Sequence, residues 1–329
     1  MIKSKLCCFY PILLLSTQVL ASDDELNVYS FRKYELIKPM LQAFEQHSGV
    51  KVNLVNGKST FLLSRLKADG TESRADVILS SDLAQLSAHR DLLQPMTELK
   101  GWSILPSVFK DPNQRWISLS MRTRALFTRK GAGSHKNTFV PTRFAQFNES
   151  KVQGKFCVRD WRHSYNKTLF ASLLSGKNPQ DTQWMAKANQ LLAKRPTGGD
   201  RDQLRALAKG QCHYALANHY YWHMMKQSNN KQDVKLASQL AMHFLQMANG
   251  QTPVSTTTAA IAKHAPNKKN ALAFIDFLLQ PQTQKMYAQL LNEFPVVAID
   301  GYQLPFEPAL KNINLGLDYT QNAHDILSL

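Results

Sequence analysis

The sequence lacks the short motifs that mark common classes of enzyme. Its 329 residues contain no G-x-S-x-G turn, no H-E-x-x-H metal motif, no phosphate loop and no C-x-x-C pair. Asp200 and Asp202 follow two glycines and are typical of the start of a helix. Because function has to be argued from a site and no catalytic site is visible, we expect no enzymatic activity.

Long hydrophobic runs are also missing beyond the first residues of the chain. The apolar stretch Leu6–Leu15 follows Lys3 and Lys5 and precedes a small-residue cleavage site that ends at Ala21. This stretch is well short of the roughly 20 apolar residues that a membrane-spanning helix needs, and no later segment reaches that length. We therefore expect residues 1–21 to be an export signal that is cleaved, rather than a membrane anchor.

Cysteine is scarce. Two of the four cysteines, Cys7 and Cys8, lie within the export signal and lack the preceding small residues that lipid attachment needs. The other two, Cys157 and Cys212, form an even pair in an exported protein, and each follows a glycine-containing turn and begins a short apolar stretch. We expect a Cys157–Cys212 disulfide. Two buried free thiols are the alternative, and a metal site is disfavoured because no second pair with ligand spacing lies nearby.

Acidic residues are too few to balance the basic ones. The chain has 40 Lys and Arg against 24 Asp and Glu, a formal charge of +16. The basic residues are scattered over predicted helix faces and no nucleic-acid motif is present, so we expect no nucleic-acid partner. The excess instead indicates a solvated basic surface that attracts an anionic membrane or an anionic carrier of the ligand.

Strands and helices alternate along the chain. Strands are predicted at residues 26–31, 50–55 and 75–80, with helices at 34–47 and 61–68 between them. The alternation resumes with strands at 154–160 and 213–218, and with helices at 165–174, at 182–193, near 198–210 and from 220 onward. This order predicts an α/β fold with mostly parallel sheets and ligands beyond the carboxyl ends of the strands.

Two long extended segments separate these regions. Residues 116–130 are predicted to cross from one region to the other, and residues 253–265 are predicted to run back. Two crossing strands of this kind form a hinge. We therefore expect a first α/β lobe made of residues 22–122 and 254–293 and a second made of residues 123–253 and 294–329, with helices at 267–279 and 281–291 closing the fold.

Four tyrosines stand where a predicted strand gives way to a helix. Tyr220 and Tyr221 directly follow a strand, and Tyr34 and Tyr165 each open a helix. A single tyrosine at such a place is usually core or interface filler. Their shared position in two lobes, however, directs the phenols toward the expected cleft.

Phenol oxygens in such a number favour a hard, highly charged cation such as Fe(III). A free phenol, with a pKa near roughly 10, is a poor ligand, but an adjacent trivalent ion strongly favours the phenolate. Four phenolates against three positive charges leave a net charge near minus one. The nearby cations expected to balance it are Arg32, Lys33, Arg124 and Arg162.

Longer stretches of the sequence resemble the periplasmic ferric-iron-binding proteins of bacterial ABC transporters. The resemblance runs in order from about residue 26 to about residue 297 and includes VYSFRKYE, LKADGTESRADVILSSD, RPTGGDRDQLRALAKGQC and ALANHYY. It implies a two-lobed periplasmic-binding-protein clamp whose metal ligands are Tyr34, Tyr165, Tyr220 and Tyr221. It also implies a periplasmic protein, expected to be a monomer, that carries Fe(III) as its transported ligand to an ABC-transporter permease in the inner membrane.

The sequence departs from this family at two positions. Lys33 stands where many relatives have a histidine ligand, and residues 57–66 lack a glutamate that some relatives use. Because a charged lysine does not normally coordinate a metal, the fifth position is expected to be taken by water or a small anion, or to stay empty. His163 and His219 lie near the tyrosines in sequence, but a histidine at such a position is more often structural.

The competing hypothesis is a clamp for a small anion without metal. A phosphonate, thiosulfate or small carboxylate would then be held by Arg162 and by backbone amides at helix starts. In the iron hypothesis, the second lobe carries three tyrosines and makes first contact with the metal. Closure about the hinge then brings Tyr34 to the site.

Overall fold

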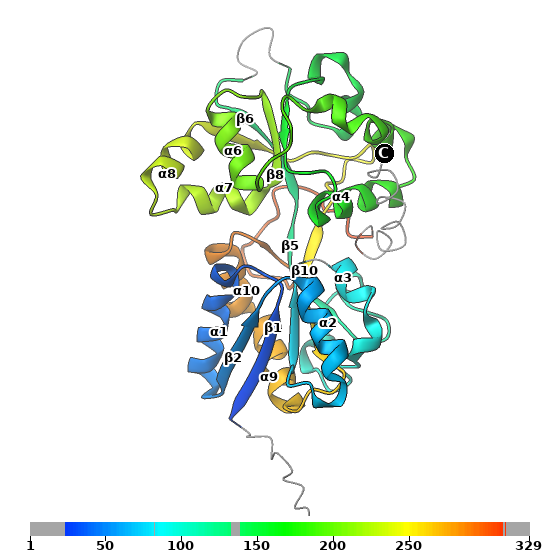
Figure 1. Ribbon diagram of the computed structural model, residues 1–329, viewed down its shortest axis with the longest axis vertical. Coiled ribbons are helices and arrows are strands. Elements are labelled where there is room, and N and C mark those ends of the chain that lie inside the picture. Colours follow the sequence, from blue (N-terminus) through cyan, green and yellow to red (C-terminus); the bar gives the residue numbers. More distant parts are fainter. Residues whose placement is uncertain (1–23, 82, 133–138, 312, 314–329) are drawn as a thin grey trace, which may run out of the picture.

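The computed structural model describes residues 24–81, 83–132, 139–311 and 313. The predicted export signal, residues 1–21, lies outside these residues. The chain forms two lobes joined by β5 (Ile117–Arg122) and β10 (Ser255–Ala262), which run between them (Figure 1). None of the helices in the described ranges is both long and apolar enough to cross a bilayer. The predicted alternation of helices and strands is present, and it is divided between two separate sheets.

The first lobe is built on the larger sheet, whose strand order is β11-β5-β10-β3-β1-β2, with β4 pairing β10. β1 pairs in parallel with both β2 and β3, and β10 is antiparallel to β3 and β5. β3 is buried along its whole length because helices cover both faces of the sheet (Figure 1). Its other strands are β1 (Glu25–Ser30), β2 (Lys51–Asn56), β3 (Val77–Ser80), β4 (Leu93–Gln94) and β11 (Phe294–Pro295).

Apolar residues at helical spacing fix the helices of this lobe. Along α1 (Tyr34–Ser48), the buried side chains recur every three to four residues, and Phe44 packs against Phe274 with ring centroids 5.0 Å apart. Gly49 ends α1 in the left-handed region, with φ of 76°, and its N–H bonds the carbonyl of Glu45. The other helices are α2 (Ser59–Asp69), α3 (Leu83–Ser87), α9 (Lys268–Leu279), α10 (Pro281–Leu290) and the 3-10 turns Gly70–Glu72, Arg90–Leu92, Lys100–Trp102 and Ser107–Phe109.

The second lobe has a smaller sheet in the order β7-β8-β6-β9. β7 is parallel to β8, whereas β6 is antiparallel to both β8 and β9. The strands are β6 (Arg124–Arg129), β7 (Phe156–Val158), β8 (Tyr214–Asn218) and β9 (Leu240–His243). The helices are α4 (Ser164–Ser175), α5 (Pro179–Thr182), α6 (Asp200–Ala208), α7 (His219–Lys226), α8 (Lys231–Ser238) and the 3-10 segments Phe144–Asn148, Ser150–Val152 and Gln183–Leu191.

The single helix predicted at 182–193 was wrong. α5 ends at Thr182, and a 3-10 segment with a kink at Lys187 follows it. Met185, Ala188 and Leu191 are all buried and recur every third residue. A 3-10 helix has three residues per turn, so this period aligns them along its axis, whereas in an α-helix of 3.6 residues per turn they would lie on one broader face.

Where the chain first passes from the first lobe to the second, a single residue makes the crossing. β5 ends in the larger sheet at Arg122 and β6 begins in the smaller sheet at Arg124, with Thr123 between them. The Thr123 hydroxyl donates to the carbonyl of Pro253, 2.7 Å away, on the returning path. This bond ties the two crossing segments together at the point where the lobes meet.

The expected assignment of residues 294–329 to the second lobe needs a correction at its start. Phe294 and Pro295 form β11, which pairs with β5 and therefore extends the larger sheet. The chain reaches the second lobe only afterwards, where the N–H of Ala309 bonds the carbonyl of Thr252. Without β11, β5 would be the edge strand of the larger sheet. The chain therefore adds β11 to that edge before it crosses to the second lobe.

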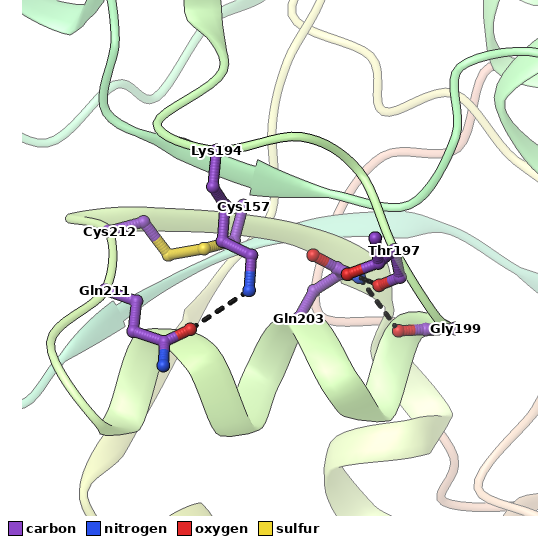
Figure 2. Close-up of a disulfide and its surroundings, with 7 residues drawn as sticks. All are labelled: Cys157, Lys194, Thr197, Gly199, Gln203, Gln211 and Cys212. Carbon is purple, nitrogen blue, oxygen red and sulfur yellow. Dashed lines mark hydrogen bonds between the residues drawn. A yellow bond between two sulfur atoms is a disulfide. The ribbon is translucent and has the colours of Figure 1, made fainter.

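The predicted disulfide is confirmed. Cys157 on β7 is bonded to Cys212, which lies just before β8, with their Cα atoms 5.8 Å apart (Figure 2). Both sulfurs are buried. The parallel pairing of β7 with β8 places the two residues side by side, so the bond joins the strand that leads to α4 with the turn that follows α6.

Removing this disulfide is expected to destabilise the protein. Replacing both cysteines by alanine frees a loop with a sequence separation of 55 residues, and the loop-entropy relation gives a loss of about 4 kcal/mol in the free energy of unfolding. Urea unfolding of the metal-free protein measures this loss. Treatment with a thiol reductant should lower the midpoint of the native protein but not that of the double variant. Equal midpoints for the native and double-variant proteins would contradict the prediction.

Candidate metal-binding site

A cleft of about 690 Å³ lies between the lobes. The first lobe contributes the residues after β1 and the start of α2, and the second lobe contributes the starts of α4, α6 and α7. Arg122, at the end of β5, lies in the same wall. The cleft therefore stands where the carboxyl ends of strands from both lobes meet, as the strand order predicted.

Three of the four predicted tyrosines meet in this cleft. Tyr165 comes from the first turn of α4, and Tyr220 and Tyr221 come from the first turn of α7. The hydroxyl of Tyr220 lies 3.4 Å from that of Tyr165, and the rings of Tyr220 and Tyr221 have centroids 4.3 Å apart. The phenol groups thus lie together although Tyr165 and Tyr220 are 55 residues apart in the sequence.

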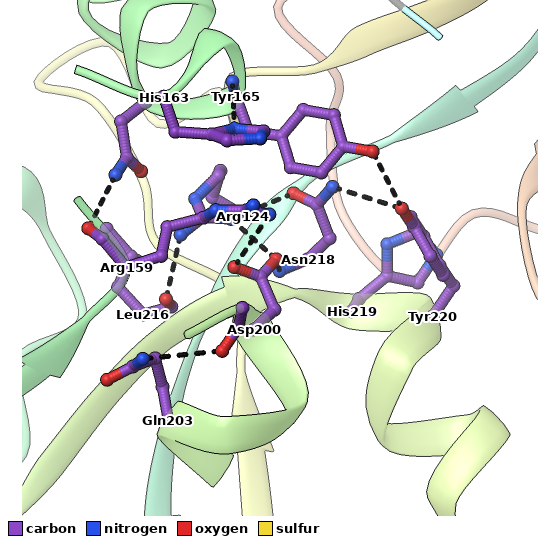
Figure 3. A network of polar contacts seen from close by, with 12 residues as sticks. Arg124, Arg159, His163, Tyr165, Asp200, Gln203, Leu216, Asn218, His219 and Tyr220 are labelled. Carbon is purple, nitrogen blue, oxygen red and sulfur yellow. Dashed lines mark hydrogen bonds and ion pairs between the residues drawn. The ribbon is translucent and has the colours of Figure 1, made fainter. Parts of the chain in front are cut away.

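A cap positions the start of α4, and a contact between side chains accompanies the start of α7. His163 precedes α4, and its Nδ1 accepts a hydrogen bond from the backbone N–H of Tyr165 at 3.2 Å. α7 begins directly after β8, and the side chain of Asn218 at the junction donates to the Tyr220 hydroxyl at 3.5 Å (Figure 3). The strand-to-helix junctions therefore direct the tyrosines toward the cleft.

Tyr34 is not brought to the same place. Its side chain is 46% exposed and does not line the cleft. The ammonium group of Lys38 lies 5.6 Å from the centre of its ring. The preceding residue, Lys33, does line the cleft, so Tyr34 stands one residue from its wall. Its role as a ligand remains a prediction.

The cations closest to the tyrosines are mostly not those expected from the sequence. The guanidinium carbons of Arg122 and Arg159 lie 5.4 Å and 5.0 Å from the centre of the Tyr165 ring. Lys33, which was expected, has its ammonium 5.5 Å from the centre of the Tyr221 ring. Arg122 is itself almost fully buried. A charged residue at the end of an otherwise buried strand was the signal in the sequence that could have pointed to it.

Arg162 lies away from the cleft, contrary to expectation. Its side chain is exposed and forms an ion pair with Asp160, with Nη2 and Oδ2 2.7 Å apart. This partner is only two residues away, so it holds the guanidinium at the surface. The hydrogen bond from Arg162 lowers the pKa of the Asp160 carboxyl to about 2.

Arg32 lies in the cleft wall with a carboxylate partner that sequence reasoning missed. Its Nη2 is 2.6 Å from Oε1 of Glu293, and both side chains are buried. Glu293 lies between α10 and β11 and also lines the cleft. Nothing in its local sequence marks this glutamate, because its partners come from β5, β10 and the loop after β1.

Arg124 supports the site from behind rather than lining the cleft. Its Nη1 lies 2.8 Å from Oδ2 of the buried Asp200, which also accepts the N–H of Asn218 at 2.8 Å (Figure 3). Arg159 approaches the other oxygen of Asp200 at 3.5 Å. Asp200 therefore connects the start of α6 with β6, β8 and the arginine that faces Tyr165.

Burial favours the neutral phenol at Tyr220 and Tyr221. It raises the pKa of Tyr220 well above its usual value, and the neighbouring Tyr165 and Tyr221 raise it further. Burial likewise raises the pKa of Tyr221, with Tyr165 as the next cause. Arg122 acts in the opposite direction on Tyr220. A strong nearby cation would shift this balance toward phenolate.

The two histidines near the tyrosines differ in position. His163 lines the cleft, and burial followed by the charge of Arg159 lowers the pKa of its imidazole to about 4. His219 is fully buried and stacks on Phe294 with ring centroids 4.3 Å apart, outside the cleft. Among the described residues, no group of three or more His, Cys, Asp and Glu side chains is placed to hold a metal ion.

Comparison with solved structures supports the clamp architecture. The apo ferric ion-binding protein A of Pasteurella haemolytica is 30% identical, with a TM-score of 0.80 over 93% of this chain and 97% of that chain. A Trichodesmium protein solved with iron and citrate is 29% identical, with a TM-score of 0.81 over 92% of this chain and 98% of that chain. The predicted fold class, a two-lobed periplasmic-binding-protein clamp, is confirmed.

Sequence comparison gives the same relationship. Iron uptake protein A1 of Synechocystis is 30% identical over 84% of this chain and 76% of its own length. The major ferric iron-binding protein of Neisseria meningitidis is 24% identical over 83% of this chain and 81% of its own length. These relatives are named for iron uptake and iron binding rather than for a reaction. The family model for bacterial extracellular solute-binding proteins matches residues 39–300, and the chain therefore belongs to this family.

Proposed function

We propose that the protein binds one Fe(III) ion in its cleft through the phenolates of Tyr165, Tyr220 and Tyr221. The observation that carries the proposal is the convergence of these three phenols from two helix starts, beside Arg122 and Arg159. Three phenolates balance the charge of a ferric ion, and anionic oxygen is the donor that such a hard ion prefers. The iron is the transported ligand and not a resident cofactor.

Closure of the clamp completes the site in this proposal. The second lobe supplies Tyr165, Tyr220 and Tyr221 and makes first contact with iron. Rotation about β5 and β10 then brings Tyr34 of the first lobe to the metal. A fourth phenolate leaves one negative charge, and Lys33 stands in the cleft wall beside Tyr221 to compensate it.

The proposed setting is the periplasm. The export signal predicted at residues 1–21 would direct the chain there, and membership of an extracellular solute-binding family supports that location. The iron-loaded monomer would deliver its ion to an ABC-transporter permease in the inner membrane. The names of the relatives support an uptake role, and an enzymatic activity is not part of this proposal.

Equilibrium dialysis against ferric citrate tests the proposal. The protein compartment should gain one iron per chain with Fe(III), and this gain should fall when citrate is added in large excess. A parallel dialysis under reducing conditions compares the uptake of ferrous iron. If the protein compartment holds no more ferric iron than a matched compartment without binding protein, the proposal is wrong.

Tyr34→Phe is expected to weaken iron binding without removing it. The three tyrosines of the second lobe remain, so the complex should keep part of its colour while affinity falls roughly tenfold, or about 1.4 kcal/mol. Competition with citrate, followed by visible absorbance, measures the change. Tyr302→Phe is the control because Tyr302 is also partly exposed but does not line the cleft. Affinity equal to that of the native protein would remove Tyr34 from the ligand set.

A small anion is the second candidate ligand, and one observation favours it. The Nε atoms of Arg32, Arg122 and Arg159 are buried without a hydrogen-bond partner in the described part of the chain, and all three residues line the cleft. Guanidinium N–H groups of this kind recognise carboxylates and phosphonates. Saturable binding of thiosulfate or a phosphonate without metal, together with no uptake of ferric iron, would favour this function over iron transport.

A further inference from the structure

A chain of buried polar contacts runs along the hinge from the first lobe to Tyr165. It begins at the ion pair of Arg32 with Glu293, in which Nη2 lies 2.6 Å from Oε1. The other carboxylate oxygen of Glu293, Oε2, lies 3.3 Å from the hydroxyl of Thr257. Thr257 in turn lies 3.0 Å from Nη1 of Arg122, whose guanidinium faces the ring of Tyr165. The connection therefore joins the loop after β1, the segment between α10 and β11, both hinge strands and α4 of the second lobe.

Thr257 is the central member of this chain. Its hydroxyl accepts the hydrogen bond from Arg122 and donates one to Glu293, two roles that a hydroxyl can combine and a methyl group cannot. Thr257 is fully buried and does not itself line the cleft. The pairing of β10 with β5 shifts register between Thr257 and Thr258, so the strand is irregular at this point.

The neighbouring threonines show that the contact is specific to one position. Thr256, Thr257 and Thr258 are all buried in β10. Within the described residues, the hydroxyls of Thr256 and Thr258 have no hydrogen-bond partner, whereas that of Thr257 has two. A buried hydroxyl that bonds a guanidinium and a carboxylate gives a larger stabilisation than a neutral pair.

We propose that Thr257 is a positioning residue that holds Arg122 against Tyr165 and couples iron at this tyrosine to the Arg32–Glu293 pair of the first lobe. This inference rests on the proposed ferric function and adds to it a path between metal and hinge. Once Tyr34 completes the proposed site, iron and four phenolates together carry one net negative charge, which attracts Arg122 more strongly than a neutral phenol ring does. Thr257 and Glu293 connect Arg122 to Arg32 of the first lobe, so the attraction favours the closed arrangement in which Arg32 and Tyr165 face the same cleft. The closed cleft then slows the release of the ion.

Thr257→Val is the direct test because valine keeps the shape of threonine and removes the hydroxyl. The native protein and the variant are loaded from ferric citrate, and iron release to excess EDTA is followed by stopped-flow absorbance. We expect release to be about tenfold faster in the variant, in line with the loss of a hydrogen bond to charged groups. The phenolate-to-iron band should also move to longer wavelength, because an Arg122 that is no longer held near Tyr165 stabilises the phenolate less.

Three matched variants separate positioning from general destabilisation. Thr256→Val and Thr258→Val remove buried hydroxyls that have no partner, and they should leave the release rate and the band unchanged. Thr257→Ser keeps the hydroxyl and should also behave like the native protein. If Thr257→Val does not fold, Arg122→Gln breaks the same connection from its other end and should show the same faster release and band shift.

The outcomes distinguish this inference from the function on which it rests. A native protein that takes up no ferric iron would overturn the proposed function. A native protein that binds iron, together with a Thr257→Val variant of equal release rate and band position, would overturn only the role of Thr257. The same is true if Thr256→Val or Thr258→Val accelerates release as much as Thr257→Val.

Discussion

Replacing both Tyr220 and Tyr221 by phenylalanine is expected to abolish ferric binding and the visible colour of the complex. The double variant removes two of the three phenol oxygens that meet in the cleft and leaves only that of Tyr165 in place. One phenolate neither satisfies the coordination of Fe(III) nor balances its charge. The loss should therefore exceed the roughly 10- to 100-fold that removal of a mere hydrogen-bond partner of a ligand costs.

The folded state should survive this double change. Phenylalanine keeps both rings, and the lost hydroxyl of Tyr220 has long contacts, 3.4 Å to the hydroxyl of Tyr165 and 3.5 Å to the side chain of Asn218. Tyr214→Phe serves as the matched control, because Tyr214 is a buried tyrosine of the same lobe whose hydroxyl donates to the carbonyl of Phe139, away from the cleft. The control should bind iron as the native protein does. Retention of colour by the double variant would show that the ligands lie elsewhere.

Asp200→Asn is expected to cost about 3–5 kcal/mol in the free energy of unfolding. The change leaves the buried guanidinium of Arg124 without its carboxylate partner, 2.8 Å away in the native protein. Burial lowers the pKa of Arg124 while Asp200 raises it, so the carboxylate is the group that makes the buried charge tolerable. The neutral amide has a similar shape but cannot supply that charge. Urea unfolding of the metal-free protein measures the loss.

Asp202→Asn is the control for this prediction. Asp202 lies in the same first turn of α6 and pairs with Arg205 at 2.7 Å, but its side chain is 52% exposed. Exposed pairs of this kind are worth about 0–1 kcal/mol, so the control should unfold close to the native midpoint. Similar losses for both variants would mean that burial of the Asp200 pair does not determine its contribution.

Sequence periodicity predicted most of the strands and helices because burial follows a regular spacing in them. α1 begins at Tyr34, as predicted, and ends at Ser48, one residue beyond the predicted end. The predictions failed where non-local pairing decides the structure, or where two kinds of helix share a similar local pattern. The pairing of β11 with β5 depends on a free sheet edge, and the 3-10 segment Gln183–Leu191 depends on a three-residue burial period that resembles a helical one.

Sequence reasoning placed three tyrosines in the cleft more successfully than it placed the charged residues around them. Tyr165, Tyr220 and Tyr221 were recognisable because each follows a strand, and the carboxyl ends of strands face the cleft. Arg122 and Glu293 were missed because the contacts that orient them come from residues far away in sequence, such as Thr257. Arg162 was expected near Tyr165, but its ion pair with Asp160 holds it at the surface. Both residues are close to Arg162 in the sequence, so the sequence alone did not show which of them it contacts.

Titration of the metal-free protein with ferric citrate, followed by visible absorbance, tests the central claim most directly. The account predicts a phenolate-to-iron charge-transfer band that grows with added iron, saturates at one Fe(III) per chain and does not form with ferrous iron under reducing conditions. The absence of such a band, while the protein still binds a small anion saturably, would contradict a tyrosine-based ferric site in this cleft.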